Sequence, residues 1–114
     1  MIDAAIQMNA GEKRTPYAYA TADSGTLTIS GSPTYSLYDS SGTVVSGHSA
    51  QAVTGYDNTA LAAVRVWKQI DATSPTTLSA GKYRIVFTFS ATKSVDSLTE
   101  RFVREVQINI SAIP

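Results

Sequence analysis

Apolar and polar residues alternate one by one through much of this chain, and this pattern limits the fold more than any other feature of the sequence. In the stretch GKYRIVFTFS, every second side chain is large and apolar: Tyr83, Ile85, Phe87 and Phe89. In the stretch ERFVREVQINI, the same spacing holds for Val106, Ile108 and Ile110. Because successive side chains of a β-strand point to opposite faces, each stretch predicts a strand with one face in the core and the other in water.

Shorter stretches alternate in the same way around Tyr17, Leu27 and Leu37. Counting all such stretches gives about seven or eight strands, with turn signals at intervals of about 8 to 12 residues, which is typical of a β-sandwich. A chain of 114 residues has the usual length of one domain. We therefore predict an all-β, antiparallel sandwich that forms a single domain over residues 1–114.

The alternation also predicts the core and one hairpin. The side chains expected to be buried are Leu27, Ile29, Leu37, Tyr83, Ile85, Phe87, Phe89, Val106, Ile108 and Ile110. The strands near 82–90 and 100–109 are expected to pair antiparallel. A loop symmetric about Ser94 and Val95 would place Arg84 opposite Glu105, as a cross-strand ion pair on the wet face.

The segment from Asp57 to Ile70 allows two interpretations. Asp57 could cap a helix, with Leu61, Val64 and Trp67 at helical spacing. Against this, Val64 and its apolar neighbours also alternate with polar residues, and β-branched residues are frequent in the second half. We predict a strand from about 62 to 70 and keep the helix as the alternative.

The charge balance and the absence of cysteine exclude several classes of partner and of chemical site. Nine Lys and Arg residues balance nine Asp and Glu residues, and charged residues make up only 16% of the chain. Nucleic acids and anionic membranes attract proteins with a surplus of basic residues, so we expect neither as a partner. The chain has no cysteine, which excludes disulfides, thiolate zinc sites and thiol nucleophiles.

Asp39, in the stretch YDSSGTVV, is the residue that most resembles a metal ligand. A calcium loop needs several carboxylates or amides at alternate positions and a later Glu, whereas DSSGT supplies one carboxylate. A turn accounts for the same residues, because Asp accepts hydrogen bonds from the backbone two residues on and Gly42 can adopt a positive φ. We therefore predict a structural turn at Asp39 and no metal site.

His48 is the one histidine of the chain, and neither a catalytic triad nor a zinc site is spaced around it. The sequence also has no nucleophile elbow and no glycine-rich phosphate loop. We predict that His48 lies on the surface or at a strand end. We expect no catalytic residue, no cofactor and no enzymatic activity.

Tyr17 and Tyr19 are the candidate contact residues. They fall on one face of an early strand with alanines on the other face, and exposed tyrosines contribute strongly to protein interfaces. The alternative is that both rings cover the core. Trp67 could stack on a sugar, but we predict a core position for it. The segment 1–14, which is polar and mixed in its second half, is a candidate N-terminal arm that becomes ordered on a neighbouring protein.

The order of several short motifs along the chain is similar to that of a known group of protein modules. A strand ending in Leu37, Tyr38 and Asp39 with Gly42 is followed later by the pattern L-x-x-G-x-Y, formed by Leu78, Gly81 and Tyr83. This order, over roughly residues 25 to 110, resembles the immunoglobulin-like β-sandwich modules of tailed-phage virions, found in capsid decoration, neck and upper baseplate proteins. The L-x-x-G-x-Y pattern is also similar to the corner tyrosine of immunoglobulin domains, although the inter-sheet cysteines of antibody domains are absent.

The resemblance implies an immunoglobulin-like fold and a non-enzymatic structural protein of a phage virion. A capsid decoration or head–tail accessory protein would bind other virion proteins of the capsid, neck or tail, and a homo-oligomer is compatible with this role. We expect it to be made in the host cytoplasm and located in the virion, since the N-terminal residues lack the basic start and apolar stretch of a signal peptide. The alternative is a carbohydrate-binding or adhesive immunoglobulin-like module of a cell surface or tail.

Overall fold

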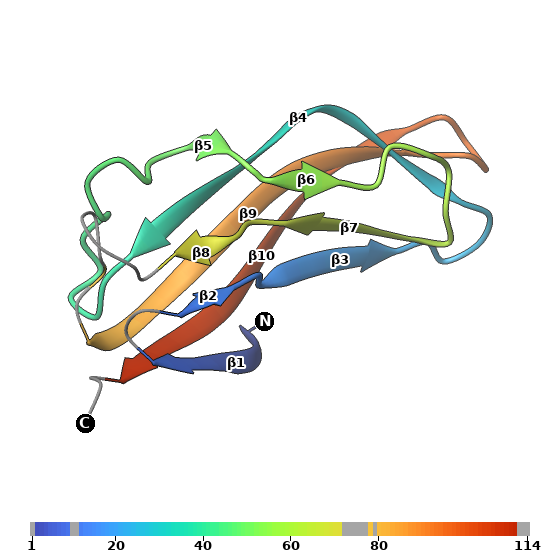
Figure 1. The fold of residues 1–114 in the computed structure, drawn as a ribbon. Helices are drawn as coiled ribbons and strands as arrows, with labels where there is room; N and C mark the ends of the chain where they lie inside the picture. Colours follow the sequence, from blue (N-terminus) through green and yellow to red (C-terminus); the bar gives the residue numbers. More distant parts are fainter. Residues whose placement is uncertain (1, 10–11, 72–77, 79, 112–114) are drawn as a thin grey trace.

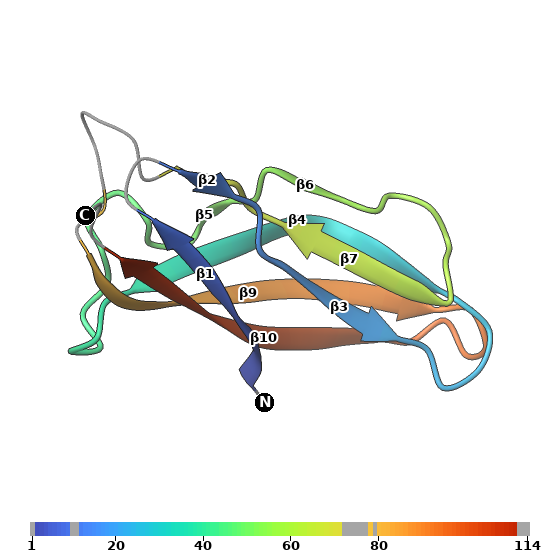
Figure 2. The same cartoon turned by 60° about the horizontal axis from the view of Figure 1, so that its bottom comes forward.

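Two layers of β-strands face one another in an elongated molecule (Figures 1 and 2). The computed structural model describes residues 2–9, 12–71, 78 and 80–111. Its strands are β1 (Ile2–Asn9), β2 (Lys13–Arg14), β3 (Tyr17–Thr21), β4 (Leu27–Tyr38), β5 (Gln51–Ala52), β6 (Gly55–Tyr56), β7 (Ala63–Trp67), β8 (Ile70–Asp71), β9 (Gly81–Lys93) and β10 (Thr99–Ser111). Within these described residues there is no helix of the length and apolar character needed to cross a membrane.

One layer is a five-stranded sheet in the order β1-β10-β9-β4-β5, and the other has the order β3-β7-β6. The short pair β2–β8 continues the β3–β7 ladder in the same register. The ladder is interrupted next to Pro16, whose nitrogen has no hydrogen to donate. If β2–β3 and β7–β8 are each taken as one interrupted strand, the described part of the sandwich has eight strands, as predicted.

The strand order is that of an immunoglobulin-like sandwich. In such domains the B, E and D strands share one sheet, and the C, F and G strands with a C′ strand share the other. Here β3, β7 and β6 form the first set, and β4, β9, β10 and β5 form the second. The predicted fold class is therefore confirmed. One strand pair departs from the antiparallel pattern, because β1 runs parallel to β10.

The segment predicted to be an N-terminal arm is part of the sandwich in this structure. Residues 2–9 form the edge strand β1 along β10 (Figure 1), and residues 13–14 form β2. The Met8 side chain is buried in the core, and Ile6 packs against the core. Ile6 and Met8 have the two-residue spacing of one strand face in the sequence. The polar residues that follow them make this strand pattern hard to recognise. Among the described residues of the predicted arm, 2–9 therefore form an edge strand and 13–14 form a short strand with β8.

The long hairpin of β9 and β10 confirms the predicted antiparallel pairing but not its register. The loop is centred between Val95 and Asp96, so Arg84 lies opposite Gln107. The prediction that Arg84 lies directly opposite Glu105 is wrong by two residues. The two side chains are diagonal neighbours instead, and Arg84 Nη1 still donates a hydrogen bond to Glu105 Oε1 at 2.9 Å. Long side chains can span such a diagonal.

All ten side chains predicted for the core are buried. The opposing sheet contributes Ala18 and Ala20 from β3 and Val64 and Val66 from β7, all fully or almost fully buried. Burial of these faces removes apolar surface from water, which is the main stabilising contribution to a domain of this size.

The segment after Asp57 is a strand, so the helix alternative is wrong. Val64 and Val66 face inward in β7, and Ile70 faces inward in β8. Trp67 has the opposite parity from the two valines, and the pleat therefore directs it to the outer face, where it is half-buried. Its predicted position in the core is wrong for this reason.

Candidate functional site

Asp39 forms a turn, as predicted. One of its carboxylate oxygens, Oδ1, accepts hydrogen bonds from the Ser41 amide at 2.9 Å, the Ser41 hydroxyl at 2.6 Å and the Thr43 amide at 3.0 Å. Gly42 has a φ of 84°, a conformation that glycine adopts without strain. The Ser41 hydroxyl and then the Thr43 amide hold the pKa of the Asp39 carboxyl below its ordinary value. The turn is therefore fixed by its own hydrogen bonds.

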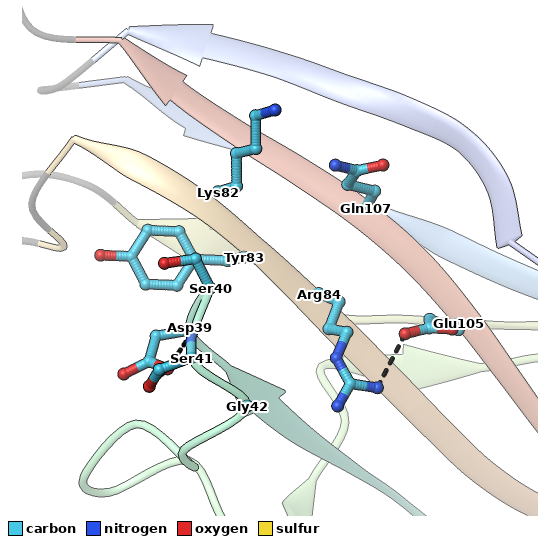
Figure 3. A pocket seen from close by; sticks show the side chains of 9 residues that line it. All are labelled: Asp39, Ser40, Ser41, Gly42, Lys82, Tyr83, Arg84, Glu105 and Gln107. Atoms are coloured by element: carbon cyan, nitrogen blue, oxygen red, sulfur yellow. Dashed lines mark hydrogen bonds and ion pairs between the residues drawn. The ribbon is translucent and has the colours of Figure 1, made fainter.

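A hollow of about 450 Å³ lies between this turn and the strands β9 and β10 (Figure 3). Lys82 and Arg84 project from β9, and Glu105 and Gln107 project from β10, on the side that borders the turn. Tyr83 also lines the hollow. We call this hollow the turn pocket, formed by residues 39–42, 82–84, 105 and 107. Three segments far apart in the sequence contribute to it, so no single stretch of sequence could have indicated it.

Arg84 is held on two sides in the turn pocket. Its guanidinium carbon lies 4.8 Å from the centroid of the Tyr38 ring, within the range of a cation–π contact. Its Nη1 atom binds Glu105 at 2.9 Å. A guanidinium has five N–H donors, so this single bond leaves further donors on Arg84. The arrangement places a fixed cation, a carboxylate and an amide side by side.

Tyr17 and Tyr19, the predicted contact residues, lie on the outer face of β3. Their exposed fractions are 54% and 49%, while the intervening alanine is buried. The alternative that the two rings cover the core is therefore wrong. In the β3–β7 ladder, Tyr17 lies opposite Trp67, and Tyr19 lies opposite Arg65. We call these four residues, Tyr17, Tyr19, Arg65 and Trp67, the aromatic face.

The Trp67 ring lies closely over the backbone of the neighbouring strand. A Cβ atom at Gly55 would come within 2.7 Å of the ring, so the absence of a side chain there lets the indole pack against β6. The Arg65 guanidinium carbon is 5.8 Å from the Trp67 ring centroid, and Arg65 Nε donates to Asp57 Oδ2 at 3.3 Å. Trp67 and Arg65 are thus held in place beside the two tyrosines.

His48 lies in the loop before β5 and is half-buried. Its Nδ1 atom is 2.6 Å from the hydroxyl oxygen of the buried Tyr35. Burial, and then the nearby positive charge of Lys68, lower the pKa of the His48 imidazole, and burial raises the pKa of the Tyr35 hydroxyl. His48 thus stays partly exposed in a loop close to the start of β5, and its ring fastens this loop to Tyr35 of β4.

Within the part of the chain that the structure describes, no three His, Asp or Glu side chains come close enough together to hold a metal ion. The Asp39 carboxylate accepts a hydrogen bond from the Ser41 amide, and the Asp57 carboxylate accepts one from the Arg65 amide of β7.

No family model matches this sequence, and no curated protein matches it. Among solved structures, the chain is similar to part of a family 123 glycoside hydrolase from Clostridium perfringens, studied for glycolipid glycan hydrolysis, with 10% identity and a TM-score of 0.48. That similarity covers 96% of this chain but only 23% of the hydrolase chain. The CooA pilin subunit from enterotoxigenic Escherichia coli shares 13% identity and a TM-score of 0.37, over 94% of this chain and 90% of the pilin. Neither similarity is close enough to indicate the function of this protein.

Two of the four residues of the aromatic face are predictable from the local sequence pattern. The alternation in PYAYATA placed Tyr17 and Tyr19 on one side of a strand. The same alternation in the stretch AVRVW places Arg65 and Trp67 on the outer side of the neighbouring strand. At Trp67 this parity decides the position, and the usual preference of a lone tryptophan for the core does not. The turn pocket had no comparable signal.

Proposed function

We propose that this chain is a non-enzymatic structural protein of a phage virion, either a capsid decoration or a head–tail accessory protein. In this proposal it binds another virion protein through the aromatic face. The virion role is supported by the resemblance carried by Leu37, Tyr38, Asp39, Gly42, Leu78, Gly81 and Tyr83. The contact role is supported by a single observation, the exposure of Tyr17 and Tyr19 beside Trp67.

The physical reason is the free energy that such rings contribute when covered. Tyrosine and tryptophan bury large areas and lose little conformational freedom on binding, and they are enriched among the residues that dominate interface affinity. The backbone under Tyr17 and Tyr19 is held by the β3–β7 ladder, and Ala18 and Ala20 fix the strand to the core. The rings are therefore presented in a preorganised position, which lowers the cost of binding.

The test is binding to particles. Purified chain is mixed with virions or assembly intermediates that lack it, and the amount that co-sediments is measured. Replacing both Tyr17 and Tyr19 with Thr keeps a residue suited to strands but removes the rings. We expect at least a tenfold loss of affinity, equivalent to about 1.4 kcal/mol.

A matched control is Val103→Thr on β10, since Val103 is 49% exposed but lies in the other sheet. The control is expected to co-sediment like the unmodified chain, and all variants are expected to keep their melting temperature. Undiminished loading of the double variant would overturn the role of the aromatic face. Gene neighbours that encode no portal, capsid or tail protein would count against the virion role itself.

A further inference from the structure

We propose that the turn pocket binds a saccharide. The pocket is separate from the aromatic face, and the inference does not depend on the proposed virion role. It rests on the size of the hollow, the balance of its charges and the fixed position of its main donor.

The size and setting suit a small ligand. A volume of about 450 Å³ falls within the range of about 300 to 1,000 Å³ found for small-molecule sites. Two walls come from the long paired strands β9 and β10, and the third comes from a turn that Asp39 ties together with three hydrogen bonds. Sites built on such fixed elements keep their geometry when the ligand is absent.

The charges of the pocket favour a neutral ligand. Lys82 and Arg84 carry positive charge, Asp39 and Glu105 carry negative charge, and Arg84 is already paired with Glu105. An anion or a cation entering the pocket would therefore meet groups of both signs. A hydroxyl group is both donor and acceptor, so a ligand with several hydroxyls can donate to the carboxylates and accept from the cations at the same time.

The polar groups of the pocket are those that recognise hydroxyls by hydrogen bonding. Arg84 is held between the Tyr38 ring and Glu105 and keeps further N–H donors. The Gln107 amide makes a long contact of 3.5 Å with Asn109 Oδ1. Hydrogen bonds to ionised groups are stronger than those between neutral groups, and a donor that is already fixed loses little conformational entropy when a ligand binds.

The experiment is a titration of the full chain, followed by the backbone amide signals in nuclear magnetic resonance spectra. The probes are the methyl glycosides of glucose, galactose, mannose and N-acetylglucosamine. We expect one of them to cause saturable shifts at residues 39–42, 82–84 and 105–107, with a Kd in the millimolar range. A trisaccharide of the same sugar distinguishes a free sugar from a glycan chain as the source, because a chain-binding site gains affinity with the longer probe and a site for a free sugar does not.

The variant Arg84→Met keeps the apolar stem over Tyr38 and removes the donors. It should weaken binding at least about tenfold, since a hydrogen bond to a charged group contributes about that much. The control Arg101→Met removes an exposed arginine from β10 outside the pocket and should bind as the unmodified chain does. Thermal melts of both variants check that the fold is retained.

Three results would overturn the inference. The first is the absence of saturable shifts with every glycoside, and the second is a set of shifts that lies at Tyr17 and Tyr19 instead of the turn pocket. The third is tighter binding of inorganic phosphate or glycine than of any sugar, which would make the site one for ions or zwitterions. Loading of the Arg84→Met chain onto particles is expected to be normal, so failure here leaves the proposed virion role untouched.

Discussion

Replacing Phe87 with Ala tests whether the inner face of β9 is the centre of the core. Phe87 is fully buried, and its strand is paired on both sides, with Tyr35 of β4 and Arg104 of β10 as its direct neighbours. Because both ladders hold β9 in place, the surrounding backbone cannot close over the space that the ring leaves. The loss therefore includes the transfer free energy and the cavity, and we expect about 3 to 5 kcal/mol.

The assay is urea unfolding, with a thermal melt as a second measurement. For a domain of this length about 1 kcal/mol corresponds to a shift of roughly 4 °C, so the melting temperature should fall by about 12 to 20 °C. The adjacent-strand control Val103→Ala, on the exposed face of β10, should change stability by less than about 0.5 kcal/mol. A loss below about 1 kcal/mol for Phe87→Ala would mean that the two faces of the sheet are assigned the wrong way round.

Three further predictions concern the edge strand, the histidine and metals. Deleting residues 1–9 removes the parallel partner of β10 and the buried Met8 side chain, so stability should fall by at least about 2 kcal/mol; an unchanged melting temperature would restore the interpretation of this segment as an arm. Folding lowers the pKa of His48 from its ordinary value of 6.5. Between the lowered pKa and pH 6.5, the unfolded chain therefore binds more protons than the folded chain. The free energy of unfolding is consequently highest above pH 6.5 and decreases as the pH falls below that value. Melting temperatures measured from pH 7.5 to 5.5 should therefore decline for the unmodified chain and stay nearly level for His48→Gln; parallel curves would show that His48 is not the group responsible. Melting temperatures with chelator and with millimolar calcium should agree, and a rise of several degrees in calcium would indicate that Asp39 or Asp57 is a ligand.

The part of the fold that the sequence predicts well is the part governed by period-two alternation. Side chains of the same parity within a strand share one face, and the face with the large apolar residues is the one that is buried, so the ten core residues and the pairing of the long hairpin could be predicted without knowing which other strands are neighbours. The turn at Asp39 was predictable for a similar reason, because its hydrogen bonds reach no further than Thr43. Local chemistry was sufficient in both cases.

The errors had both local and distant causes. The parity of Trp67 within β7 already directs its ring outward, and only its packing over Gly55 depends on the pairing of β6 with β7. The pairing of residues 2–9 with β10 joins the two ends of the chain, and no local pattern predicts which edge a terminal strand will join. The hairpin register depended on a loop of five residues between β9 and β10, where a shift of one residue in the centre moves every partner by two.

The two candidate surfaces, the aromatic face and the turn pocket, consist largely of outward-facing residues of the same alternating strands. The outward-facing positions of each strand do not pack in the core, so many residue types can occupy them without destabilising the core. On β3 and β7 those positions hold Tyr17, Tyr19 and Trp67, which offer area and little charge. On β9 and β10 they hold Arg84, Glu105 and Gln107, which offer directed hydrogen bonds. Because each set lies on a different sheet of the sandwich, the proposed particle contact at the aromatic face would leave the turn pocket open, so that one domain could bind a protein and the proposed sugar at the same time.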